Sequence, residues 1–153
     1  MYNKSVAITG STIEKTTKYD QFREDKSRME LYRIILSLYN EGYRTFTCNL
    51  HSYIGLLGAD TIVILREADK CPEITLSVVI PGTAFPTDID KVYRALYDDL
   101  MKQADNKEML PEKEVFSNTL TGSHIVCYYD DFSEEIRQVR ASGIPYTNIR
   151  KMI

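Results

Sequence analysis

Four acidic residues form the densest group of side chains able to do chemistry in this sequence. Asp130 and Asp131 are followed closely by Glu134 and Glu135. Carboxylates grouped in this way can hold Mg²⁺ or act as general acids and bases. Acidic residues in the first turn of a helix are also stabilised by the helix dipole, and this role is the one we expect for the group. We therefore predict no metal site there.

The two histidines are a second source of acid-base chemistry. His51 lies beside Asn49 and Tyr53, and its imidazole could transfer a proton or contact a ligand, because histidine titrates near neutral pH. A structural role for His51 is the alternative that we favour. His124 begins an apolar run, and we expect it to form local hydrogen bonds.

Nucleophilic and metal chemistry find little support elsewhere in the chain. Cys48, Cys71 and Cys127 are far apart and form no CxxC pair, so we expect neither structural zinc nor a disulfide framework. Cys48 and Cys127 lie within apolar runs and should be buried. Ser11 and Ser52 lack the context of a nucleophile elbow. We predict no cofactor and no catalytic residue.

The length of the chain is typical of a single domain. We expect its 153 residues to form one domain, residues 1–153, whose strands and helices position these side chains. The net charge of −3 and pI near 5.4 argue against a nucleic-acid partner. No run approaches the roughly 20 apolar residues that span a bilayer. Residues 1–4 show no signal-peptide pattern, so we expect a cytoplasmic protein without a membrane partner.

The first part of the chain predicts a strand, a helix and a second strand. Residues 5–9 are apolar and partly β-branched and stop at a glycine, as in a buried strand. Ser27 and Glu30 form a capping-box pattern, which predicts a helix from Ser27 to Gly42. Residues 43–48 alternate as a second strand does.

The middle of the chain repeats the alternation. Residues 61–65 have the β-branched density of a strand but stand in a longer apolar run with helical spacing, and we predict a buried helix. Residues 74–80 form a continuous strand pattern. Thr87 and Asp90 predict the start of the next helix. Residues 105–113 are charged and predict a linker.

The last part of the chain adds two strands and a helix after a short apolar run at residues 115–116. Residues 124–129 predict a strong strand, and residues 133–142 a helix closed by a glycine and a proline. Residues 144–149 can supply the last strand. The whole pattern predicts an α/β, Rossmann-like three-layer sandwich with a mostly parallel sheet and helices on both faces.

Ligands of such folds bind at the carboxyl ends of the strands, where the strand order reverses. The loops at these ends are residues 10–12, 49–53, 81–85 and 130–133. We expect a ligand between the turns at residues 9–12 and 49–53, with Asn118 and Asp130 on the far side. The predicted ligand-binding residues are Thr9, Gly10, Ser11, Asn49, His51, Asn118 and Asp130.

Three stretches carry a family resemblance. They are Ile8-Thr9-Gly10, the block at residues 46–81, and Asn118 ahead of the strand at residues 124–129. The chain resembles the SLOG superfamily, and within it the YpsA-like branch, whose relatives include DprA and the LOG phosphoribohydrolases. This resemblance implies a Rossmann-like bacterial protein that binds a nucleotide derivative.

The chain departs from the family at its phosphate-binding turns. The pattern G-x-A-x-G-x-D corresponds to positions that here hold Asn49, His51, Tyr53 and Gly55. The family's Gly-Gly-Thr turn is replaced by residues 131–133, where two carboxylates would repel a phosphate. Relatives often carry His and Arg where this chain has Ser11 and Thr12. We therefore expect a degenerate or repurposed pocket.

Two functions are compatible with these observations. The leading hypothesis is a noncatalytic module of the SLOG type that senses a small ligand or contacts a protein, with a homodimer as one arrangement. The alternative is a hydrolase or transferase acting on a nucleotide glycosidic bond, which would use Asp130, Asp131 and Glu134. The glycines of the LOG catalytic turn are missing at residues 130–133.

Overall fold

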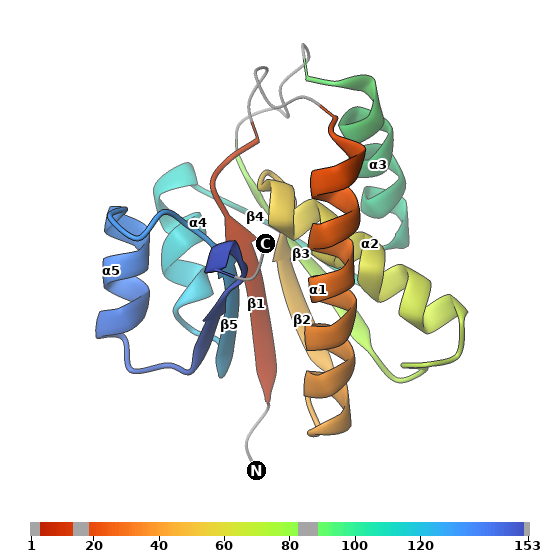
Figure 1. Cartoon of the computed structure of the whole chain (residues 1–153), viewed down its shortest axis with the longest axis horizontal. Helices are drawn as coiled ribbons and strands as arrows, with labels where there is room; N and C mark the ends of the chain where they lie inside the picture. Colours follow the sequence, from red (N-terminus) through yellow and green to blue (C-terminus); the bar gives the residue numbers. More distant parts are fainter. Residues whose placement is uncertain (1–3, 14–18, 83–88, 152–153) are drawn as a thin grey trace.

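The six strands and five α-helices of the described residues alternate along the chain (Figure 1). A computed structural model describes residues 4–13, 19–82 and 89–151. The strands are β1 (Ser5–Gly10), β2 (Thr45–Asn49), β3 (Thr75–Pro81), β4 (Asn106–Leu110), β5 (His124–Tyr128) and β6 (Tyr146–Asn148). The helices are α1 (Gln21–Asn40), α2 (Tyr53–Glu67), α3 (Lys91–Gln103), α4 (Glu112–Thr119) and α5 (Glu134–Ala141), and a 3₁₀ turn follows at Ile149–Lys151.

All six strands run parallel in the order β4-β3-β2-β1-β5-β6, which confirms the predicted fold class. From β1 the chain moves outward through β2, β3 and β4 and then returns to pair β5 with the other edge of β1. The strand order therefore reverses at β1, between β2 and β5. Side chains at the carboxyl ends of these three strands face a crevice that such folds use for ligands.

The helices form two unequal layers around this sheet (Figure 1). The long helices α1, α2 and α3 cover one face, where Val6 and Ile8 of β1 enter the main core. The eight-residue helices α4 and α5 lie on the other face. A smaller core there joins Ile125 and Cys127 of β5 to Ile136 of α5. The second face is thinly covered, so it leaves room for a cavity.

Helix α2 confirms the buried helix predicted at residues 61–65. Two glycines let it approach the sheet closely. A Cβ on Gly55 would lie 1.8 Å from the carbonyl oxygen of Asn49, and one on Gly58 would lie 2.9 Å from the Ile8 side chain. Because side chains at these positions would collide with the sheet, glycine fixes where α2 begins relative to β2.

The predicted start of the first helix is wrong. Helix α1 begins at Gln21, and Asp20 is its N-cap, since the Asp20 carboxylate accepts a hydrogen bond from the Arg23 backbone N–H at 3.1 Å. Ser27 lies buried inside the helix, where its hydroxyl donates to the Arg23 carbonyl at 2.8 Å. Ser27 thus satisfies its hydroxyl within the helix rather than capping it.

The predicted linker at residues 105–113 is also wrong, because it contains β4 and the start of α4. Strand β4 is an edge strand whose first four side chains are exposed, so no apolar alternation marks it. Asp105 fixes its beginning by accepting a hydrogen bond from the Leu76 N–H at 2.9 Å. At α3 the N-cap is Asp90 itself, and Thr87 lies outside the described residues.

The three cysteines are free and buried, as predicted for Cys48 and Cys127. No helix in the described parts of the chain is long and apolar enough to cross a bilayer.

Candidate functional site

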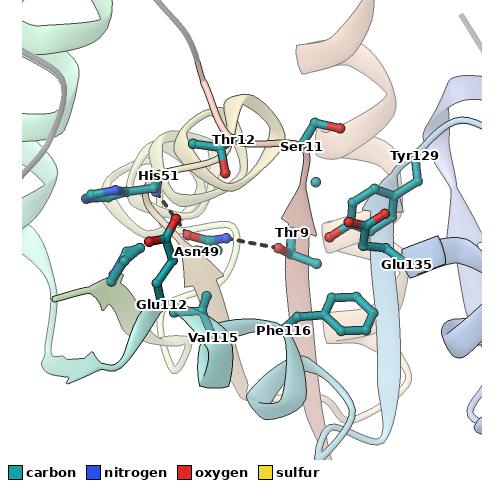
Figure 2. A pocket seen from close by; sticks show the side chains of 12 residues that line it. Thr9, Ser11, Thr12, Asn49, His51, Glu112, Val115, Phe116, Tyr129 and Glu135 are labelled. Carbon is teal, nitrogen blue, oxygen red and sulfur yellow. Dashed lines mark hydrogen bonds between the residues drawn. The ribbon is translucent and has the colours of Figure 1, made fainter. Parts of the chain in front are cut away.

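A cavity of about 430 Å³ opens at the carboxyl ends of β1, β2 and β5 (Figure 2). Its walls come from the turns after these strands and from the first turns of α4 and α5. Thr9, Gly10, Ser11, Thr12, Asn49, His51, Pro81, Glu112, Val115, Phe116, Tyr129 and Glu135 line it. The cavity therefore lies at the point where the strand order reverses.

A row of hydrogen-bonded polar groups crosses the floor of the cavity. The Asn49 side-chain amide donates to the Thr9 hydroxyl at 3.2 Å, and the Asn49 side-chain oxygen accepts from the His51 backbone N–H at 3.0 Å. Burial raises the pKa of the Tyr129 phenol, and hydrogen bonding with Thr9 partly opposes that rise. These bonds link the carboxyl ends of β1 and β2 to the turn that holds His51, and Tyr129 follows β5 directly.

The two turns that form the upper wall are tied together. The Ile13 backbone N–H donates to the His51 carbonyl at 2.7 Å, and Thr12 forms an antiparallel bridge with Ser52. Ser52 is the N-cap of α2, because its hydroxyl accepts from the Gly55 N–H at 2.8 Å. The turn after β1 is thus fixed to the first turn of α2.

His51 forms part of this wall and is 3% exposed. Its ring packs edge-on against Tyr97, with the ring centroids 5.7 Å apart. Burial lowers the pKa of His51, so the imidazole is neutral at pH 7. A neutral imidazole offers one donor and one acceptor. His51 is therefore a buried ring in the wall of the cavity, and its part in ligand binding stays a prediction.

The charged side chains that line the cavity are both carboxylates. Glu112 and Glu135 lie on opposite sides of it, with Asn49 and Thr9 between them (Figure 2). They belong to the first turns of α4 and α5, where the helix dipole favours acidic residues. Among the described lining residues there is no lysine or arginine. The negative electrostatic potential of the two carboxylates repels anions and attracts cations.

A smaller cavity of about 160 Å³ shares Ser11 and Thr12 with the main cavity. Arg23 lines it together with Tyr53 and Tyr128. The guanidinium carbon of Arg23 is 4.8 Å from the centroid of the Tyr53 ring, so the ring orients this side chain.

Five of the seven predicted site residues come together in the main cavity: Thr9, Gly10, Ser11, Asn49 and His51. Asn118 and Asp130 do not line it. Asn118 lies on the later part of α4, beside Thr47 and Val79 of the sheet. The Asp130 carboxylate accepts from the Phe132 N–H at 3.0 Å and pairs with Arg150 at 3.4 Å.

The acidic group at residues 130–135 is divided by the fold. Asp131 pairs with Arg140 at 3.5 Å, and Glu134 pairs with Arg137 at 3.7 Å, both away from the cavity lining. Only Glu135 reaches the cavity. The described residues contain no group of three or more histidine, cysteine or carboxylate side chains suited to a metal ion.

Sequence reasoning missed the walls that come from α4 and β5. Val115 and Phe116 of α4 face the cavity, and the Phe116 ring packs edge-on against Tyr129 with the ring centroids 6.2 Å apart. Glu112 lies within the stretch that predicts a linker. A signal was present for Tyr129, since the period of two along residues 124–129 places residues 125, 127 and 129 on one face of the sheet.

Comparison with protein-family models finds no match, and comparison with curated proteins finds no relative of this chain.

Proposed function

We propose that this chain is a noncatalytic module of the SLOG type that binds a small ligand in the 430 Å³ cavity. The observation that carries the proposal is the position of the cavity at the strand-order reversal, with a hydrogen-bonded polar floor formed by Thr9 and Asn49. Cavities that hold small molecules range from about 300 to 1,000 Å³. The volume supports a ligand of the size of a nucleoside.

The charge of the cavity limits the chemistry of the ligand. Glu112 and Glu135 would repel a phosphate, and no cation among the described lining residues would offset them. The floor offers amide and hydroxyl groups to an uncharged polar ligand. We therefore propose an uncharged or cationic ligand, with a nucleoside or nucleobase preferred to a phosphorylated nucleotide.

Thermal-shift screening followed by titration calorimetry tests this proposal. Nucleosides, nucleobases, small amines and the corresponding nucleoside monophosphates form the panel. A ligand at 100 times its dissociation constant should stabilise the fold by about 2.7 kcal/mol. We expect shifts from uncharged or cationic compounds and none from the monophosphates. A shift produced by monophosphates alone would contradict the proposed ligand class.

A pair of variants localises the binding. Asn49→Ala removes a group from the cavity floor and should weaken binding at least tenfold. Asn118→Ala truncates the same residue type outside the cavity lining and should leave binding unchanged. Equal effects of the two substitutions would place the ligand elsewhere.

Hydrolysis of a glycosidic bond is the second candidate function. Two carboxylates on opposite sides of a cavity are the groups that such hydrolysis uses, one as acid and one as base or nucleophile. The relevant pair would be Glu112 and Glu135, in place of Asp130, Asp131 and Glu134. Release of free base from nucleosides or nucleoside monophosphates, lost in Glu112→Gln and Glu135→Gln, would support hydrolysis. No release by the parent protein would remove this candidate.

A further inference from the structure

The four carboxylates between residues 130 and 135 differ in what they contact. Three of them lie outside the cavity lining, and each is paired with an arginine. These pairs are Asp130–Arg150, Asp131–Arg140 and Glu134–Arg137. Glu135 lines the cavity, where it is half-buried, and its carboxylate forms no hydrogen bond or ion pair with the described residues. The carboxylate inside the cavity is thus the one of the four that lacks an arginine partner within the described parts of the chain.

Two aromatic rings lie on the same side of the cavity as Glu135 (Figure 2). The rings of Phe116 and Tyr129 meet edge-on, with an angle of 75° between their planes and their centroids 6.2 Å apart. Burial raises the pKa of the Tyr129 phenol, and the negative charge of Glu135 adds to that rise. The phenol is therefore neutral at pH 7, and the Glu135 carboxylate lies near enough to act on it.

A carboxylate beside two aromatic rings suits an organic ammonium ion. The faces of aromatic rings attract cations, and a carboxylate accepts strong, charge-assisted hydrogen bonds from the N–H groups of a protonated amine. An anionic ligand would be repelled by Glu135. A metal ion finds too few ligands, because the described residues contain no group of three histidine, cysteine or carboxylate side chains suited to one. The chemistry of this side of the cavity therefore favours an amine.

The remainder of the cavity suits an aliphatic chain attached to that ammonium group. In Figure 2, Val115 and Phe116 lie between Glu135 and the second carboxylate, Glu112, on the opposite side. These two apolar side chains of α4 offer contacts to methylene groups, whose removal from water contributes to binding. The cavity thus joins a site for a positive charge to an apolar surface along α4.

We propose that the ligand of the cavity is a protonated organic amine whose ammonium group lies between the Glu135 carboxylate and the rings of Phe116 and Tyr129. This inference rests on the ligand-binding function proposed above. It narrows the ligand class from uncharged or cationic compounds to cationic ones. Glu135 provides the counter-charge, and the two rings stabilise the cation through their faces.

NMR titration with matched pairs of compounds tests the preference for a positive charge. Propylamine, butylamine and hexylamine are each compared with the alcohol of the same chain length. At pH 7 the amines are protonated and the alcohols are uncharged, whereas the shapes of each pair are alike. Each amine should bind about tenfold more tightly than its alcohol, which is the effect expected of a charge-assisted hydrogen bond in a half-buried site.

Isosteric substitutions identify the carboxylate that receives the ammonium group. Glu135→Gln keeps the shape of the side chain and should weaken amine binding about tenfold without changing alcohol binding. Glu134→Gln is the matched control, because it makes the same change of net charge one residue earlier, outside the cavity lining. Phe116→Leu keeps an apolar side chain but removes the ring, and it should weaken amine binding about threefold. Thermal melting confirms that each variant is folded.

The possible results separate this inference from the function on which it rests. Binding of alcohols or nucleosides that is weakened by Asn49→Ala, with no preference for amines, would overturn the amine ligand and leave the ligand site in place. Equal effects of Glu134→Gln and Glu135→Gln on amine binding would overturn the role of Glu135. Absence of binding by every amine, alcohol and nucleoside tested would overturn both the inference and the proposed function.

Discussion

The Asn49 side-chain amide lies 3.2 Å from the Thr9 hydroxyl and joins the carboxyl ends of β2 and β1 across the floor of the cavity. This bond holds the Asn49 side chain in the orientation in which its oxygen accepts from the His51 N–H. The polar floor is therefore organised before any ligand arrives. Preorganisation of this kind reduces the free-energy cost of binding.

Replacing Thr9 with valine should destabilise the fold and loosen this floor. Thr9→Val leaves the Asn49 amide without its acceptor at a nearly buried site, at a cost of about 1–2 kcal/mol in the free energy of unfolding. Urea denaturation measures the change. Thr47→Val, on the same face of β2 but outside this network, is the control and should cost less than half as much. Equal losses in the free energy of unfolding of the two variants would show that the hydrogen bond between Asn49 and Thr9 does not stabilise the fold.

The two histidines should make the fold less stable in mild acid. Burial lowers the pKa of both His51 and His124, so the unfolded chain binds protons more readily than the folded one. The free energy of unfolding should be constant above about pH 7 and fall as the pH drops below the ordinary histidine pKa of about 6.5. Denaturation at pH 7.5, 6.5 and 5.5 measures this fall.

His51→Asn isolates the contribution of one ring to that pH dependence. It removes a titrating group from the cavity wall, so its stability should fall less steeply between pH 7.5 and 5.5 than that of the parent. Identical slopes would mean that His51 titrates alike in the folded and unfolded chain.

The three thiols should be unreactive in the folded protein. Burial raises the pKa of Cys48 and Cys71, and it raises that of Cys127 to about 12. Because the thiolate is the reactive form, iodoacetamide at pH 8 should leave the native protein unmodified. After denaturation, mass spectrometry should show three modified cysteines. Fast labelling of a native cysteine would contradict the burial described for it.

Gly55→Ala should destabilise the fold severely, because the new Cβ would lie 1.8 Å from the Asn49 carbonyl oxygen. Helix α2 would have to move away from β2, and we expect a loss of more than about 3 kcal/mol or no folded protein. Gly122→Ala is the control, since its Cβ would make ordinary contacts at 3.5 Å. Thermal melting compares the two, and a Gly55→Ala variant as stable as the control would show that α2 can shift freely.

Sequence patterns predict the strands that are buried on both faces, because such strands consist of continuous apolar runs. The continuous apolar runs of β1, β3 and β5 predict buried parallel strands, and the structure confirms them. Strand β4 escapes prediction because an edge strand with exposed side chains needs no apolar face. The start of α1 escapes it because Asp20 competes with the more complete capping pattern at Ser27 and Glu30.

Some residues of the candidate site can be predicted from the sequence and others cannot. Thr9, Asn49 and His51 are predictable because they lie at or just after the carboxyl ends of strands, and these ends meet at one edge of the sheet. Glu112 cannot be predicted in this way, because its position depends on how α4 packs over that edge of the sheet. Asp130 is predicted at the cavity from its position after β5, yet its carboxylate contacts the Phe132 N–H and Arg150 and does not line the cavity.

The helix α4, which lines the cavity, is held less firmly than α2, which lies on the other face of the sheet and contributes none of the described lining residues. Ten residues of α2 are buried, whereas α4 buries only Val115 and Thr119 among its eight residues. Segments with few buried contacts open more often in native-state fluctuations, so the amide protons of α4 should exchange with deuterium well before those of α2. A ligand held between Asn49 and Glu112 would slow exchange chiefly in α4. Occupancy of the cavity would then be detected as a stiffening of this one short helix.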